Sequence, residues 1–539
     1  MTPPIVEQTP TVHNQSMRDS APEAGRPCRA EVLAALSVSI DLGLGQPAQH
    51  MLHSAGIACR LAERLGLSEQ QRGTVYYTTL LMWIGCHADS QEYARWFGDD
   101  IAVREAAYLV DWSGLPYLTF LVRHVAHGEA PAHRAKVLAE LFRDARGQLR
   151  QLLHSHCSSA AVLARHFGLP DSVQRNLAFT FERYDGGGLP SGCGGEAIPI
   201  EMRIAQLADT GEVHHRRYGV DGAVAMATDR RGGQFDPSVV DAFTSDAEAI
   251  LTEPDGGDLW STTIRLAPDD GEPVGAAELD TLLAALGDFA DLKCPFMLGH
   301  SHGVAELAES AGQAAGLNGA ECATLRRAGL LHDIGRLGVS NQVWSQPGPL
   351  SADDWERARM HPYLGARVVS RIPGLAAEAA LVRAHHERPD GSGYPFGAAG
   401  AALGRSERLL AAAVAYRSAT EPRPYRAALT PAQAVERMNE RVRAGHLDPD
   451  AAAAVSSVAG YRRSRPPLPA GLTRREAEIL TQVARGLSNR QIAHALTLSE
   501  KTVRNHIEHT YTKVGVNNRV GASLYALSHG LADPVLEHG

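Results

Sequence analysis

Histidine and carboxylate residues in the second half of the chain occur in an order that could hold metal ions. His332 and Asp333 are adjacent, and His385 and His386 run into an acidic, glycine-punctuated turn that closes on Tyr394. Imidazole and carboxylate groups together suit borderline divalent metals such as iron, manganese or zinc. Two such ions a few ångströms apart can activate water and stabilise both oxygens of a phosphoryl displacement. The pattern therefore predicts a metal-centred phosphohydrolase site.

Two further histidines and an arginine extend this candidate site. A lone His-Asp pair is usually accidental, and one histidine is usually a helix-surface residue, so the prediction depends on the ordered combination. Asp333 can bridge two ions and the planar guanidinium of Arg336 suits a phosphate, so we expect both residues to act in catalysis. We expect substrate contacts from Arg336, Asp390 and Tyr394. The expected metal ligands are His300, His332, Asp333, His361, His385 and His386.

The first half of the chain contains segments that match the second half in the same order. Three segments within residues 30–243 match three within residues 276–460. Several matches in one order indicate a duplicated domain. The matched pairs are His53–Ala58 with His300–Ala305, Leu80–Gly85 with Leu330–Gly335, and Glu182–Pro190 with Glu387–Pro395.

The first copy lacks most of the candidate metal ligands. Met82 and Trp83 replace the His-Asp pair, and Thr180 and Phe181 replace the adjacent histidines. Because apolar side chains cannot ligate metal, we expect no binuclear site here and interpret this copy as a scaffold for dimerisation or signal input. The polar residues that it keeps are His53, His156 and Asp209.

Composition and motif order divide the chain into six parts. The first copy contains 45 extra residues, because Leu80 and His156 are 76 residues apart whereas Leu330 and His361 are 31 apart. The predicted parts are a disordered tail (1–29), the first copy (30–243), a connector (244–275), the second copy (276–460), a basic, Pro-rich linker (461–470) and a C-terminal domain (471–539). The connector encloses a short β-like run at residues 261–266.

The C-terminal domain has the pattern of a helix-turn-helix. Thr473 with Glu476 predicts a capping box, as does Ser488 with Gln491, and Ser499 is placed to cap a helix over 500–514. Cationic and amide side chains on such a helix suit base edges and phosphates. An ordinary three-helix bundle with a solvated basic face is the alternative on spacing alone. The expected DNA contacts are Arg490, Lys501, Thr502, Arg504 and Asn505.

Charge and composition set the wider context. The chain has a net charge of −9, which argues against nucleic-acid binding by the whole molecule but not by one small basic domain. No apolar run is long enough to span a bilayer, no secretory signal is visible, and the seven cysteines are scattered. We therefore expect a cytoplasmic protein without a membrane partner.

These motifs resemble two bacterial families. Residues His300, Leu331–Gly335, His361-Pro362, His385–Glu387 and Gly393–Pro395 resemble an HD-GYP domain, a branch of the HD phosphohydrolases. Residues 472–519 closely resemble a LuxR-type DNA-binding domain. The resemblance implies an all-α chain with two HD-type helical domains followed by a four-helix helix-turn-helix domain. It also implies a two- or three-metal site that hydrolyses cyclic di-GMP or a related cyclic dinucleotide, and a last helix (about 518–529) that pairs two copies as a homodimer on double-stranded DNA.

One position departs from the HD-GYP pattern. The family has a further metal-ligating aspartate after the Tyr-Pro turn, and the first copy has Asp209, 27 residues after Glu182. The residue 27 after Glu387 is Val414. The resemblance therefore implies that the ion held by His300, His332 and Asp333 loses a ligand, which leaves one or two bound ions. The other ion, held by Asp333, His361, His385 and His386, keeps its full set of ligands.

We interpret the chain as a transcription regulator in which an HD-GYP-like metal-binding module controls a LuxR-type domain, with cyclic-dinucleotide sensing or weak hydrolysis. The alternative is an active metal-dependent cyclic-dinucleotide phosphodiesterase with an accessory DNA-binding domain. A third interpretation is a scaffold in which both HD copies only dimerise.

Overall fold

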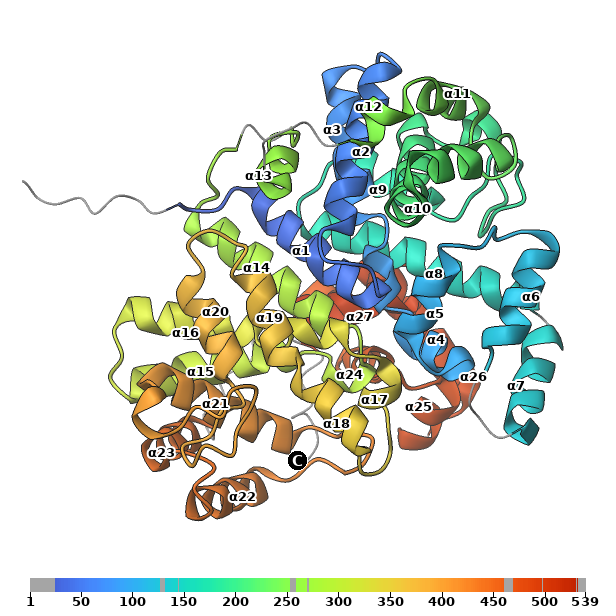
Figure 1. The fold of residues 1–539 in the computed structure, drawn as a ribbon. Coiled ribbons are helices and arrows are strands. Elements are labelled where there is room, and N and C mark those ends of the chain that lie inside the picture. Colours follow the sequence, from blue (N-terminus) through green and yellow to red (C-terminus); the bar gives the residue numbers. More distant parts are fainter. Residues whose placement is uncertain are drawn as a thin grey trace, which may run out of the picture.

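The computed structural model describes residues 25–126, 131–143, 145–252, 258–268, 271–459, 469–496, 498–529 and 531. These residues form helices joined by turns, and none of them lies in a β-strand, which confirms the all-α fold class (Figure 1). Across these ranges, no helix is both long and apolar enough to cross a membrane. Most of the predicted tail and linker lies outside the described residues.

The first half of the chain and the connector contain thirteen α-helices within the described ranges. They are α1 (Arg29–Leu44), α2 (His50–Arg64), α3 (Glu69–Leu81), α4 (Ser90–Phe97), α5 (Asp100–Ala107), α6 (Gly114–His124), α7 (Pro131–Arg143), α8 (Ala145–His166), α9 (Asp171–Asn176), α10 (Ile200–Asp229), α11 (Pro237–Ser245), α12 (Ala247–Leu251) and α13 (Leu259–Ile264). Short 3-10 helices lie at Ile84–His87, Leu177–Phe179 and Gly195–Ala197. Helices α4 to α7 come from the longer segment that distinguishes the first half.

The second half and the C-terminal domain continue the helical pattern. The second half has α14 (Ala276–Asp291), α15 (His300–Ala314), α16 (Gly319–Leu331), η5 (Ile334–Gly338), α17 (Asn341–Trp344), α18 (Ala352–Arg359), α19 (His361–Val369), α20 (Ala376–Ala384), α21 (Arg405–Thr420), α22 (Pro431–Arg443) and α23 (Pro449–Val458). Short 3-10 helices lie at Pro295–Met297 and Gly400–Ala402. The C-terminal domain has η7 (Pro469–Gly471), α24 (Arg474–Ala484), α25 (Asn489–Ala495), α26 (Glu500–Val514) and α27 (Arg519–Ser528).

The two halves share local geometry at the start of α2 and α15. Each helix follows a residue with a left-handed backbone, Gln49 in one half and Gly299 in the other. In each, a buried aspartate one helix earlier accepts a hydrogen bond from the second residue of the new helix. His50 therefore occupies the position of His300, and the sequence match that paired His53 with His300 was wrong. The wrong alignment arose because His53-Ser54, three residues after His50, repeats the dipeptide His300-Ser301.

The connector is packed rather than extended. The prediction of a β-like run at 261–266 was wrong, because residues 259–264 form α13. Asp258 accepts a hydrogen bond from the Ser261 backbone N–H and so caps the first turn of this helix. Trp260 and Thr263 are buried against the protein, and these local and tertiary contacts outweigh the β-propensity of the threonines.

A buried ion network joins the two halves. Asp100 on α5 accepts hydrogen bonds from Ser340 Oγ and from the Asn341 backbone N–H, both at 2.7 Å. Its other oxygen lies 2.9 Å from Arg104 and 3.6 Å from Lys293 Nζ. Burial alone would raise the pKa of Asp100, but the Lys293 and Arg104 cations outweigh it and lower that pKa. The carboxylate is therefore the common partner of cations from both halves.

The C-terminal domain packs against both halves through α27 and the turn between α24 and α25. Helix α27 contacts α24 of its own domain and α8 of the first half. A Cβ atom added at Gly486 would lie 2.8 Å from Pro295 of the second half, so the backbone approaches closely there. Figure 1 shows α24 and α27 in the middle of the molecule and α25 and α26 nearer its edge. The expected pairing of two copies through the last helix stays a prediction, since this helix packs within the chain.

Replacing Asp100 with alanine tests the ion network between the halves. Asp100→Ala leaves Lys293 and Arg104 buried without their carboxylate, so we expect the free energy of unfolding to fall by about 3–5 kcal/mol. Urea denaturation followed by circular dichroism measures the change. Glu105→Ala, which removes an exposed carboxylate from the same helix, is the control and should change stability by no more than about 0.5 kcal/mol. Equal effects of the two substitutions would contradict the role of the network.

Candidate metal centre and nucleic-acid interface

The six expected metal ligands come together at the ends of four helices. His300 begins α15, His361 begins α19, and His332 directly follows α16. His385 and His386 follow the last residue of α20. These residues form two clusters of three, and within each cluster the ligand atoms lie within 4.8 Å of one another. Five of the six residues are buried. The two clusters are His361, His385 and His386, and His300, His332 and Asp333.

Asp333 lies between these two histidine clusters. Its Oδ1 is 3.4 Å from His361 Nε2 and 3.9 Å from His385 Nε2. Its Oδ2 is 3.5 Å from His332 Nε2 and 3.8 Å from His300 Nε2. Each carboxylate oxygen therefore faces its own pair of imidazoles, which is the arrangement that lets one aspartate bridge two metal ions.

Backbone carbonyls fix the orientation of three of these imidazoles. The Nδ1 atoms of His332, His361 and His385 each donate to the carbonyl three residues earlier, over 2.6–2.8 Å. Each Nε2 atom then presents a lone pair to the interior of the site. His361 Nε2 and His385 Nε2 are 3.2 Å apart, and His332 Nε2 is buried without a hydrogen-bond partner. Lone pairs that face one another in a buried site fit a metal cation as their shared partner.

Burial keeps the imidazoles neutral and the carboxylate charged. It lowers the pKa of His332 to about 4 and the pKa values of His361 and His385 to about 3. Burial would raise the pKa of Asp333, but its interactions with the His332 imidazole and the Arg336 guanidinium outweigh burial and hold that pKa well below its ordinary value. Neutral imidazoles and one carboxylate are the protonation states that metal binding requires.

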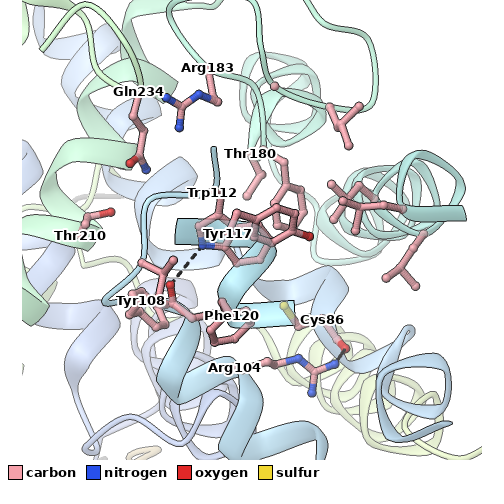
Figure 2. A pocket seen from close by; sticks show the side chains of 18 of the residues that line it. Cys86, Arg104, Tyr108, Trp112, Tyr117, Phe120, Thr180, Arg183, Thr210 and Gln234 are labelled. Carbon is pink, nitrogen blue, oxygen red and sulfur yellow. Dashed lines mark hydrogen bonds between the residues drawn. The ribbon is translucent and has the colours of Figure 1, made fainter. Parts of the chain in front are cut away.

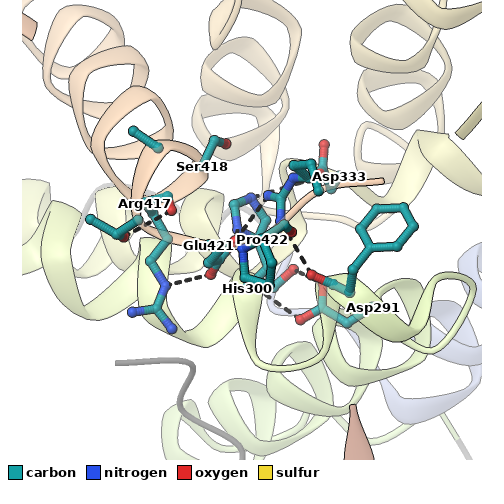
Figure 3. A network of polar contacts seen from close by, with 12 residues as sticks. Asp291, His300, Asp333, Arg417, Ser418, Glu421 and Pro422 are labelled. Carbon is teal, nitrogen blue, oxygen red and sulfur yellow. Dashed lines mark hydrogen bonds and ion pairs between the residues drawn. The ribbon is translucent and has the colours of Figure 1, made fainter. Parts of the chain in front are cut away.

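Sequence reasoning missed Glu421, which orients the fourth imidazole. His300 Nδ1 donates to Glu421 Oε2 over 2.6 Å (Figure 3). This buried carboxylate also forms an ion pair with Arg417 and accepts a hydrogen bond from Arg423. A carboxylate on Nδ1 directs Nε2 toward the metal position. The first half offered a signal. Glu212 and Arg216 form an ion pair one turn apart on α10, and Arg417 and Glu421 form one with the same spacing and the opposite order at the end of α21.

The position on α21 where the HD-GYP pattern has an aspartate is occupied by the apolar residue Val414. Val414 is buried in a cluster of aliphatic side chains. In the first half, Asp209 accepts from His50 Nε2 and from the Trp83 indole N–H, each at 3.0 Å. An aspartate at this helix position therefore reaches the Nε2 of the histidine that begins the facing helix. In the first half, protein donors already occupy that carboxylate.

The expected substrate-contacting residues lie in different surroundings. Arg336 Nη1 is 3.5 Å from Asp333 Oδ2, and its guanidinium lies over the Trp344 ring at 3.9 Å. The Tyr394 ring stacks on His386, with centroids 4.8 Å apart. Asp390 instead accepts from the Ser392 backbone N–H and hydroxyl within the turn. The structure therefore brings Arg336 and Tyr394 to the metal cluster, whereas Asp390 orders the turn.

The basic helix of the C-terminal domain has the predicted bounds and caps. Helix α26 runs Glu500–Val514, and Ser499 Oγ accepts from the Thr502 backbone N–H. Both predicted capping boxes are present, at Thr473 and at Ser488. Val503 and Ile507 are buried, whereas the expected DNA-contacting side chains point outward: Arg490, Lys501, Arg504 and Asn505 are exposed and Thr502 is half-buried.

Comparisons with known proteins agree with this two-part architecture. Residues 284–451 match the family model of the HD domain, and residues 470–526 match that of bacterial regulatory proteins of the luxR family. The chain therefore contains an HD domain followed by a LuxR-type helix-turn-helix domain.

Individual relatives match one part or most of the chain. The 3′3′-cGAMP-specific phosphodiesterase 3 of Vibrio cholerae is 27% identical over 433 residues, which cover 80% of this chain and 94% of that protein. A cyclic di-GMP phosphodiesterase of Thermotoga maritima is 38% identical over 100 residues, or 18% of this chain and 27% of that protein. The transcriptional regulatory protein YhcZ of Bacillus subtilis is 47% identical over 60 residues, or 11% of this chain and 28% of that protein.

A solved structure shares the helical fold. The crystal structure of a V. cholerae cyclic GMP-AMP specific phosphodiesterase superimposes with a TM-score of 0.57 at 24% identity. The match covers 81% of this chain and 99% of that one.

Restoring the aspartate on α21 tests the architecture of the metal centre. We expect Val414→Asp to reach His300 Nε2, as Asp209 reaches His50, and to add up to about one bound ion per chain. Metal analysis of the purified protein by mass spectrometry gives the stoichiometry. Val414→Asn, which has the same shape without the charge, is the control. Equal metal content in the wild type and both variants would contradict the role assigned to position 414.

Proposed function

We propose that this chain, in which an HD domain precedes a LuxR-type DNA-binding domain, is a transcription regulator whose metal-holding module controls DNA binding. The observation that carries the proposal is the position of the C-terminal domain. Its base-reading side chains on α26 are exposed, while its α27 packs on α8 and its α24–α25 turn approaches Pro295. Both halves therefore contact the domain that would bind DNA, so a structural change in either half could reach it.

The residues at the HD site fit one complete and one weakened metal position. Asp333, His361, His385 and His386 would hold one ion, and His300, His332 and Asp333 would hold a second with one ligand fewer. The bound metal, iron, manganese or zinc, would supply Lewis-acid activation of a phosphodiester. Asp333 would fix the spacing of the two positions, and Arg336, whose guanidinium lies over the Trp344 ring, would orient a phosphate. A cyclic dinucleotide is the ligand that the phosphodiesterase relatives suggest, for sensing or for slow hydrolysis.

We interpret the first half as a copy of the HD domain that has lost its metal chemistry. Shared details beyond the start of α2 and α15 support this interpretation. Arg203 pairs with Asp236 at the start of α11, and Arg408 pairs with Asp448 at the start of α23. In both halves the glutamate before the glycine-rich turn accepts hydrogen bonds from backbone N–H groups of that turn.

The second candidate function is an active cyclic-dinucleotide phosphodiesterase with an accessory DNA-binding domain. The extent of the match to the V. cholerae enzyme, 94% of that protein, favours it. Under this alternative the weakened metal position would retain turnover, and DNA would only localise the enzyme.

Substitutions on α26 test the assigned DNA-reading face. We expect Arg504→Ala and Asn505→Ala each to weaken binding to a duplex selected in vitro by about 1–3 kcal/mol, because each removes hydrogen bonds to a base edge or phosphate. Fluorescence anisotropy measures the affinity. Arg437→Ala, which removes an exposed arginine on α22, is the control and should leave affinity unchanged. Unaltered binding by both α26 variants would rule out this face.

A ligand-response experiment separates the two candidate functions. We expect 3′3′-cGAMP or cyclic di-GMP to change the affinity of the metal-loaded chain for the selected duplex by about tenfold, a typical allosteric coupling. Asp333→Ala should abolish the response because it removes the carboxylate shared by both metal positions. Nucleotide hydrolysis is followed in the same samples by chromatography. Rapid wild-type hydrolysis together with a DNA affinity that ignores the nucleotide would favour the phosphodiesterase alternative.

A further inference from the structure

The first half contains a large cavity where the second half has its metal site. The cavity has a volume of about 370 Å³. The residues that replace metal ligands in the first half lie in its wall, namely Met82, Trp83, Thr180 and Phe181. Side chains of α4 to α6 and α8, among them Leu152 and Leu153, line the rest. The loss of metal ligands and the extra helices together produce a ligand-sized space.

Aromatic rings dominate this wall. Trp112 and Tyr117 are stacked, with centroids 5.7 Å apart and 15° between planes (Figure 2). Trp83 meets Phe181 edge to face at 5.3 Å and Tyr108 at 5.9 Å. Flat rings in stacked and edge-to-face positions are well suited to enclose another aromatic ring.

One buried cation in the wall lacks a carboxylate partner. Three arginines line the cavity, and Arg104 and Arg183 each form ion pairs with aspartates. Arg230 is 7% exposed, and its Nη1 donates only to the side-chain carbonyl of Gln234, at 3.1 Å. Among the described residues, no carboxylate oxygen lies within 4 Å of its guanidinium. Burial lowers the pKa of Arg230, and the more distant Asp111 and Asp229 carboxylates offset this only in part.

The cavity lies close to the surface of the molecule. Leu118 on α6 lines it and is 48% exposed, so the wall at this helix separates the interior from solvent by a single layer of side chains. Figure 2 places the aromatic residues Tyr108, Trp112, Tyr117 and Phe120 on one side, and Arg183 and Gln234 together at the other. The site is thus apolar and aromatic over most of its wall and cationic at one end.

We propose that this cavity binds a small aromatic molecule that carries one anionic group, with the ring among Trp83, Trp112 and Phe181 and the anion on Arg230 and Gln234. The anion would give Arg230 the negative partner that it lacks, and the ring would fill the apolar space. The proposal does not depend on the proposed function of the chain, because it concerns binding in the half without metal ligands and is measured without DNA or nucleotide.

Calorimetric titration of the full chain with 2-naphthoate tests the proposal, with the uncharged 2-naphthylmethanol as the comparison ligand. We expect one 2-naphthoate per chain, bound at least about tenfold more tightly than the alcohol because of its charge-assisted hydrogen bonds. Ala107→Phe, which places a phenyl ring in the cavity, should greatly weaken binding of both ligands. Arg230→Gln should weaken 2-naphthoate by about tenfold and leave the alcohol unchanged.

Arg441→Gln, which removes a half-buried arginine of the second half, is the matched control and should leave both ligands unaffected. Circular dichroism establishes that each variant is folded. If Ala107→Phe does not fold, the comparison of Arg230→Gln with Arg441→Gln decides alone. No binding of 2-naphthoate by the wild type, or unchanged binding by the Arg230 variant, would overturn the proposal. Equal affinity for acid and alcohol would overturn the anionic part.

Discussion

The central constraint of this structure is the position of one buried carboxylate among neutral imidazoles. Asp333 presents one oxygen to His361 and His385 and the other to His300 and His332. These histidines lie at helix ends. Their Nδ1 atoms donate hydrogen bonds to backbone carbonyls or, for His300, to Glu421. Without a cation, inward lone pairs at 3.2 Å would repel one another. The site is therefore organised for metal even though one ligand position on α21 is a valine.

The first half surrounds its own buried aspartate with a different set of polar groups. Its Asp209 is held by His50 and Trp83. Burial would lower the pKa of His50, but its hydrogen bonds with Asp209 and Glu212 outweigh burial and raise that pKa to about 10. Asp209 thus belongs to an internal ion cluster, and apolar side chains line the neighbouring cavity. Helix α8 lines that space and also packs on α27, which places it between the cavity and the DNA-binding domain.

Much of the fold and the ligand set could be predicted because the signals are local. Ser499 and the spacing of Val503 and Ile507 set the bounds of α26 without help from the rest of the chain. The residues of the two histidine clusters were recognisable as candidate metal ligands from residue type and order. Glu421 was not, because its role depends on where the end of α21 meets the start of α15. The pairing of His53 with His300 was wrong for a related reason: short motifs resemble one another by chance, and only the helix starts identify His50.

Coupling between the metal centre and the DNA-binding domain is the central claim, and thermodynamic linkage tests it most directly. The measurement is the metal affinity of the full chain, by competition with a chelator, in the presence and absence of a saturating selected duplex. If metal changes DNA affinity, DNA must change metal affinity by the same factor. The account predicts a shift of about fivefold or more. Identical metal affinities with and without DNA would contradict it.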